Sequence, residues 1–158
     1  MAFDRTTSQV LFDNGSHKCI SFTSLVKGEG VQANQFLIID NERAAVLDPG
    51  GDLTYVPLTM ELNKYTRLAN LDLVMASHQD PDIITSMPRW LVYTDAKVVA
   101  SKLWARFLPH LNSAFMSDRM KGSWLDRLIE LPDQGQKVEL GNTSIIAVPA
   151  HFLHSVGN

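Results

Sequence analysis

The sequence predicts one layered α/β domain, with sheets inside and helices outside. Its 158 residues, 45% of them apolar, are enough for a single domain with its own core. The chain has no internal repeat, low-complexity segment or linker. Its early strands are arranged as hairpins, and its later strands alternate with helices. That order of elements is typical of a layered sandwich.

Short turns separate the strands predicted in the first third of the chain. Asn14, Gly15 and Ser16 lie between the first two runs, and only residues 41–42 separate the next two, which is hairpin spacing. The Gly-rich polar stretch 27–34 predicts a loop. We expect strands at 9–14, 18–25, 35–40 and 43–48.

From residue 49 onward, the pattern alternates between helix and strand. A proline and two glycines at 49–51 end a strand, and apolar side chains at helical spacing then predict a helix over 55–66. A helix over 83–92 should kink or restart at Pro88. Further helices are expected at 102–111 and 117–127, and strands at 71–77, 97–101, 128–131, 136–140 and 143–149.

Composition and charge exclude several classes of partner. The net charge of −3 is spread along the chain, which argues against nucleic-acid binding. No apolar run approaches the ~20 residues of a membrane span, and the N-terminus has no apolar signal-peptide core. The single cysteine, Cys19, excludes an internal disulfide and is compatible with a reducing compartment. We therefore expect a cytoplasmic protein with neither a nucleic-acid nor a membrane partner.

The stretch 77-SHQDPD-82 places three possible metal ligands at alternate positions after an apolar strand. If the backbone is extended there, the side chains of His78, Asp80 and Asp82 point to one side. Pro81 favours this, because it restricts Asp80 to extended conformations. Each residue also has an ordinary explanation: a polar group at a strand end, a turn residue and a helix N-cap. Two carboxylates and an imidazole this close, however, favour a neutralising cation. The residues alone leave both interpretations open.

A second pair of histidines, His151 and His154, follows the strand predicted at 143–149. Two strand ends that present imidazoles can meet at one end of a sandwich. Mixed nitrogen and oxygen ligands suit iron, zinc or manganese better than copper(I) or calcium. The run Ile145–Val148 is apolar on both faces, so we expect this strand to lie inside a sheet with both faces covered.

Together these motifs resemble the metallo-β-lactamase superfamily, and most closely its flavodiiron and oxygen-binding diiron branch. The superfamily motif reads His-x-His-x-Asp-His, whereas here Asp80 replaces the second histidine and Ile83 the last. The acidic replacement is similar to the His-x-Glu-x-Asp of the diiron branch. The resemblance implies a four-layer αββα sandwich. It rests on 46-VLDPGG-51, 77-SHQDPD-82, the helix with Pro88 and 149-PAHFLH-154.

Carried over by resemblance, His78, Asp80 and His151 match ligands of a first iron. Asp82 matches a ligand of a second iron, which should be held less fully because Ile83 stands where a histidine often does.

Two further residues match positions around that site. Asp48 matches a position that orders the site through hydrogen bonds. His154 is either a hydrogen-bond donor to bound oxygen or metal-bound water, or only a polar wall. The family's bridging carboxylate and late histidine come from a later part of the domain, so residues 1–158 are expected to be an incomplete metallo-β-lactamase-like domain.

The resulting hypothesis is a non-haem diiron protein that binds dioxygen and either senses or reduces it. Two irons are the expected cofactors, with zinc or manganese as alternatives, and no FMN is expected in this chain. Reduction would make it an oxidoreductase that needs a redox partner protein. The alternatives are a zinc metallohydrolase and a metal-free scaffold with a degenerate site. A chain of only these residues is expected to be unstable or aggregated, or to pair with another chain through the strand edge at 143–149.

Overall fold

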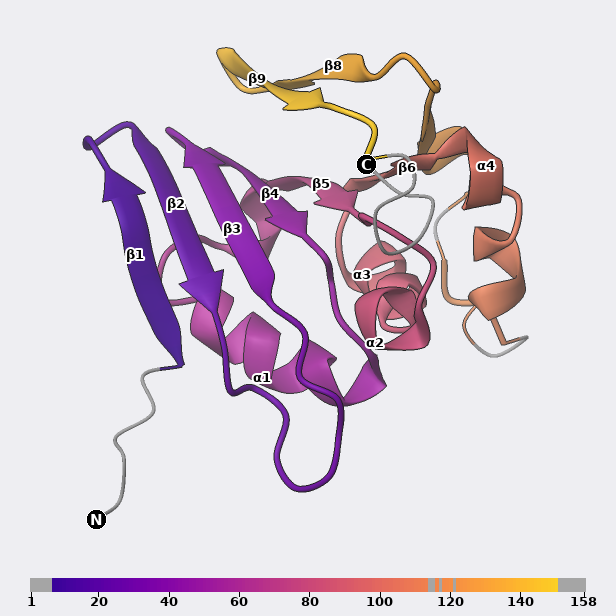
Figure 1. The fold of residues 1–158 in the computed structure, drawn as a ribbon, viewed down its shortest axis with the longest axis horizontal. Coiled ribbons are helices and arrows are strands. Elements are labelled where there is room, and N and C mark those ends of the chain that lie inside the picture. Colours follow the sequence, from indigo (N-terminus) through magenta and orange to yellow (C-terminus); the bar gives the residue numbers. More distant parts are fainter. Residues whose placement is uncertain (1–6, 114–115, 117, 121, 151–158) are drawn as a thin grey trace.

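The computed structural model describes residues 7–113, 116, 118–120 and 122–150. Its main element is a seven-stranded sheet whose strands follow chain order from β1 to β7 (Figure 1). Neighbours are antiparallel from β1 to β4 and parallel from β4 to β7. The strands are β1 (Ser8–Asp13), β2 (His17–Phe22), β3 (Gln35–Asp40), β4 (Arg43–Leu47), β5 (Leu71–Met75), β6 (Lys97–Ser101) and β7 (Leu128–Leu131).

Helices lie on one side of this sheet, and a separate hairpin lies on the other (Figure 1). The hairpin is a two-stranded antiparallel sheet of β8 (Gln136–Leu140) and β9 (Thr143–Ala147). The α-helices are α1 (Asp52–Leu62), α2 (Pro81–Ile84), α3 (Met87–Tyr93) and α4 (Lys102–Ala105). Short 3₁₀ turns are η1 (Leu68–Asn70), η2 (Leu108–Leu111) and η3 (Leu125–Arg127).

The core is divided in two by the large sheet. Alternate residues of a strand point to opposite faces, so Val98 packs in the helix-side cluster while its neighbour Val99 packs in the hairpin-side cluster. The helix-side cluster is the larger and includes Leu58 of α1 and Trp90 of α3. The hairpin-side cluster joins strands of the large sheet to β8 and β9 through Ala45, Leu73, Met75, Val99, Leu131, Val138, Leu140 and Ala147.

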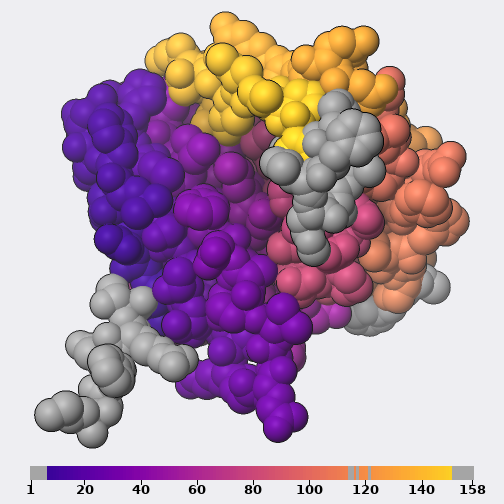
Figure 2. Space-filling view, in the orientation of Figure 1, coloured from indigo at the N-terminus to yellow at the C-terminus, as the bar shows by residue number. Residues whose placement is uncertain are grey.

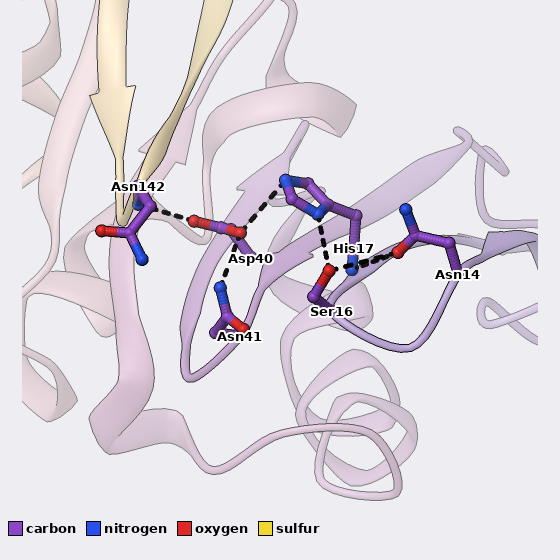
Figure 3. Close-up of polar contacts among 6 residues, drawn as sticks. All are labelled: Asn14, Ser16, His17, Asp40, Asn41 and Asn142. Carbon is purple, nitrogen blue, oxygen red and sulfur yellow. Dashed lines mark hydrogen bonds and ion pairs between the residues drawn. The ribbon is translucent and has the colours of Figure 1, made fainter.

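A buried carboxylate fastens the tip of the hairpin to the large sheet (Figure 3). Asp40 is fully buried, and its Oδ2 accepts a hydrogen bond from the Asn142 backbone N–H at 2.6 Å. Its Oδ1 lies 3.1 Å from Nε2 of His17 and accepts a bond from Nδ2 of Asn41 at 3.0 Å. Gly141 has a φ of +59°, and an added Cβ there would lie 2.5 Å from Asp40 Oδ2. Glycine therefore allows the close approach of the two turns.

The strand predictions are confirmed, while the helix predictions needed revision. The first helix begins earlier than expected, at Asp52, and ends at Leu62. The helix expected at 83–92 restarts as predicted, with Pro88 in the first turn of α3. The helical run from 102 divides into α4 and η2. The helix expected over 117–127 was wrong for the described residues, which form only η3 there.

The prediction that both faces of β9 are covered was also wrong within the described chain. Ile146 is 71% exposed and Val148 just beyond the strand is 68% exposed, so one face of β9 is open. The reason is topological, because β9 pairs only with β8 and packs one side of the hairpin on the large sheet.

Candidate metal centre

Asp48 is turned toward the strand beside it by an unusual backbone conformation. It follows β4 directly and has a φ of +57°, which residues other than glycine rarely adopt. Its N–H donates to Met75 O at 2.7 Å, across the parallel pairing of β4 with β5. The carboxylate accepts two hydrogen bonds from Ser77, from the backbone N–H at 2.8 Å and from Oγ at 3.0 Å. The ends of the two strands are thus joined through one side chain.

The Asp48 carboxyl lies in a partly desolvated environment that opposes its ionisation. Burial raises its pKa above the ordinary value. The two hydrogen bonds from Ser77 and the nearby His78 lower the pKa, whereas the charge of Asp82 raises it. A positive charge beside Asp48 and Asp82 would favour the ionised form of Asp48 and offset the repulsion between the two carboxylates.

Ser77 determines which nitrogen of His78 is available. The Ser77 hydroxyl donates its hydrogen to Asp48, and the same Oγ lies 2.8 Å from Nδ1 of His78. The oxygen therefore accepts a hydrogen bond from Nδ1–H. In the neutral imidazole this leaves Nε2 with its lone pair, which is the form that binds metals.

Nε2 of His78 faces a carboxylate oxygen. It lies 3.5 Å from Oδ2 of Asp80, with the two side chains 19% and 39% exposed. Both atoms carry lone pairs, so a metal ion placed between them would be bound by both. Donors about 2.1 Å from one ion are themselves roughly 3–3.5 Å apart. The pair therefore fits two ligands of a single ion.

The positions of Asp80 and Asp82 differ from a uniformly extended segment. Asp80 is extended, with φ −64° and ψ 141°, and is the N-cap position of α2. The helix begins at Pro81, which is favoured at a first helical position, so Asp82 lies in the first turn and not at the cap. The extended conformation expected throughout 78–82 is therefore wrong beyond Asp80.

Only part of the predicted ligand set can be placed. Within the ranges that the structure describes, no group of three or more His, Cys, Asp or Glu side chains is arranged to hold an ion. His151 and His154 lie outside those ranges. Whether His151 shares an ion with His78 and Asp80 stays a prediction.

A compact set of hydrogen bonds fixes the turn after Asp48 against α2 and α3. Gly50 N–H donates to Ile83 O at 2.8 Å, and Ser86 N–H donates to Gly50 O at 3.1 Å. The buried Ser86 hydroxyl donates to Pro49 O and accepts from Nε1 of Trp90. The sequence did not predict the roles of Ser77 and Ser86, because nothing in the spacing of these serines distinguishes them from ordinary turn residues.

An apolar cavity of about 370 Å³ adjoins Asp48 and Ser77 between the large sheet and the hairpin. Its other walls are Phe36, Leu47, Met75, Ala76, Val99, Leu131, Ile145, Ile146, Ala147 and Val148. One edge of the candidate centre thus borders a space that is poor in hydrogen-bonding groups.

Comparison with known proteins identifies the family and the fold of the chain. A family model described as "ODP family beta lactamase" matches residues 31–158. The chain belongs to the ODP beta-lactamase family. The structure of the peroxy diiron species of the chemotaxis sensor ODP superimposes on 97% of this chain and 57% of its own, with a TM-score of 0.77 and 30% identity. An apo state of that sensor, from T. denticola, has a TM-score of 0.74 and 31% identity over 96% of this chain and 56% of its own.

Other proteins resemble this chain in part of its sequence or in its fold. A putative diflavin flavoprotein A 4 from Synechocystis is 33% identical over 95 residues, which are 57% of this chain and 16% of that protein. The metallo-β-lactamase SMB-1 shares the fold, with a TM-score of 0.69 at 14% identity over 97% of this chain and 56% of its own. The predicted family and the metallo-β-lactamase-like fold are therefore confirmed.

This chain spans only part of these relatives, a little over half of the sensor structures and far less of the diflavin protein. In the part of the chain that the structure describes, no helix is long and apolar enough to cross a membrane.

Proposed function

We propose that this chain contributes part of a non-haem diiron site that binds dioxygen. The observation that carries the proposal is the pairing of His78 Nε2 with the Asp80 carboxylate, oriented through Ser77 by Asp48. A carboxylate where zinc hydrolases of the superfamily have histidine is a hard anionic donor, and it stabilises an oxidised iron better than a neutral imidazole does. The similarity to a diiron sensor at 30% identity supports the same choice.

The proposed ligand assignment follows the sequence. His78, Asp80 and His151 bind the first iron, Asp82 contributes to the second, and Asp48 holds His78 in its metal-binding tautomer. The described residues bring two donors together, so the remaining ligands, including a bridging carboxylate and a late histidine, are proposed to come from outside them. His154 is proposed to face the bound gas or a metal-bound water.

The use made of oxygen is also part of the proposal. The site senses dioxygen, or reduces it when a separate redox protein supplies electrons, since no FMN site is proposed in this chain. Zinc or manganese are the alternative metals, and a cytoplasmic location is proposed.

Metal analysis of Asp80 variants tests the proposal directly. Asp80→Ala removes a charged donor and should lower bound iron several-fold, whereas Asp80→His should shift the preference toward zinc. The measurement is elemental analysis after anaerobic loading with an equimolar mixture of iron(II) and zinc, followed by absorption spectra before and after air.

Gln79→Ala is the matched control, because Gln79 is an exposed neighbour in the same segment. It should bind as much iron as the unmodified chain. Unchanged metal content in both Asp80 variants would make Asp80 only a turn residue. Zinc alone, together with ester or lactone hydrolysis, would favour the metallohydrolase, and no metal at all would favour the degenerate scaffold.

A further inference from the structure

Helix α1 is apolar on its outer face as well as on its inner one. Tyr55, Leu58 and Leu62 are buried against the sheet and α3. The opposite side presents Leu53, Val56 and Met60, which are 71%, 50% and 67% exposed. These three residues are here named the α1 stripe. Apolar side chains that are exposed together on one face often mark an interaction surface, so the stripe is expected to be an interface.

A hollow of about 230 Å³ lies beside the N-terminal end of the α1 stripe. Its apolar walls include Val26 and Val31, from the loop between β2 and β3, together with Leu53 of the stripe itself. That loop projects beside α1 in Figure 1 and protrudes from the molecular surface in Figure 2. Val31 is 68% exposed. At the other end of the stripe, Met60 is a long and flexible side chain that suits an irregular gap. The same face thus carries a hole and a projection about two helical turns apart.

The charges at the two ends of α1 have opposite signs. Asp52 is exposed in the first turn, and Asp82 lines the hollow beside it. Beyond the last turn lie Lys64, whose side chain is 59% exposed and also bonds Glu61, and the exposed Arg67. The loop adds exposed Lys27 and Glu29, which balance each other.

We propose that the α1 stripe is a twofold interface between two copies of this chain, with the two α1 helices antiparallel. A twofold axis near Val56 places Leu53 opposite the partner's Met60, so each methionine enters the hollow of the other copy. The antiparallel arrangement also places Asp52 level with the partner's Glu61, within about one turn of the Lys64 that bonds it, at both ends. Because hole, projection and charges are all self-complementary under one rotation, a second copy fits this face.

The interface would support the candidate metal centre without forming part of it. Pro81 and Asp82 also line the hollow, so the partner's Met60 would pack against the segment that follows Asp80. The association itself rests on the α1 surface alone and does not depend on whether iron binds.

Sedimentation velocity of the 158-residue chain tests the interface. The background carries Ile146→Lys, which removes the exposed apolar side chain of β9 and with it the other expected route of association. This protein should sediment as a dimer, and adding Met60→Glu should weaken dimerisation at least about tenfold, since a carboxylate cannot be buried in the hollow unpaired. Leu11→Glu, at an exposed position on β1, is the matched control and should leave the dimer unchanged. A monomer in the background protein, or a dimer indifferent to Met60→Glu, overturns the proposal.

Charge exchange tests the antiparallel arrangement. Asp52→Lys and Lys64→Glu should each weaken the dimer, and the two together should restore it, because each interface pair then regains opposite signs. A double variant no stronger than the single ones excludes this orientation. As an independent measure, Val56→Cys in a Cys19→Ala chain should form a disulfide-linked dimer on mild oxidation, whereas Val10→Cys should not. Circular dichroism of every variant confirms that the fold is kept.

Discussion

The two faces of the seven-stranded sheet are covered to very different extents. On one face, helices α1 and α3 bury a continuous cluster that includes Leu58 and Trp90, both fully buried. On the other face, a two-stranded hairpin leaves a cavity of about 370 Å³ and an exposed Ile146. The strands are nevertheless apolar on both faces, as residues 97–101 (KVVAS) show. Such strands normally have both faces covered, so within the described residues the hairpin face is the less completely packed one.

The largest expected loss of stability tests the face of the sheet that the helices cover. Trp90→Ala should destabilise the fold by about 3–5 kcal/mol, because it leaves a large cavity against Tyr55, whose ring centroid lies 5.1 Å away. It also removes the donor to Ser86 Oγ. Urea unfolding followed by circular dichroism measures this, with the exposed Tyr93→Ala on the same helix as the control. A loss below 1 kcal/mol would mean that the helix face is as loosely packed as the other.

The next effect concerns the attachment of the hairpin. Asp40→Ala should cost about 1–3 kcal/mol, because the Asn142 N–H and the polar tip of His17 lose a buried partner. Hydrogen exchange should become faster in β8 and β9 than in β5 and β6. Glu139→Gln, at a largely exposed hairpin position, is the control. Equal acceleration in all four strands would show that the two sheets unfold as one unit.

The smallest and sharpest effect compares adjacent residues of one strand. Val98 and Val99 are both fully buried, but Val98 faces the helices whereas Val99 lines the cavity. Val98→Ala should cost more than Val99→Ala, by about 1 kcal/mol, because Val99 already lacks neighbours on one side. Chemical unfolding of the two variants measures the difference. The reverse order would show that the hairpin face is the better packed.

Much of the fold was predictable because its signals are local. The turn at Asn14, Gly15 and Ser16 and the two-residue link at 41–42 define hairpins whatever lies around them. The helix predicted over 117–127 fails for a local reason too, since Gly122 has a φ of +79° and leaves the helical region. The open face of β9 was not predictable, because the apolar residues of a strand do not show how many other elements pack against that strand.

The candidate centre was predictable only in its ligand types. The spacing of His78 and Asp80 indicated donors on one side, and both are found facing each other. The role of Ser77 depends on the left-handed backbone of Asp48 and on the parallel pairing of β4 with β5. Both are tertiary features, which no pattern of neighbouring residues reveals.

Among the described residues, Ser77 gives His78 a hydrogen bond that is already present in the folded chain, and this affects the thermodynamics of the proposed metal binding. The rotational freedom of the imidazole is lost when β4 and β5 come together, not when an ion arrives. In the proposed site, an ion at Nε2 would therefore meet a ligand whose orientation is already set by Ser77, so little ordering entropy would oppose its binding. The affinity for an ion at Nε2 should then depend mainly on the chemistry of the ligand atoms, because the entropy cost of ordering the imidazole has already been met by folding.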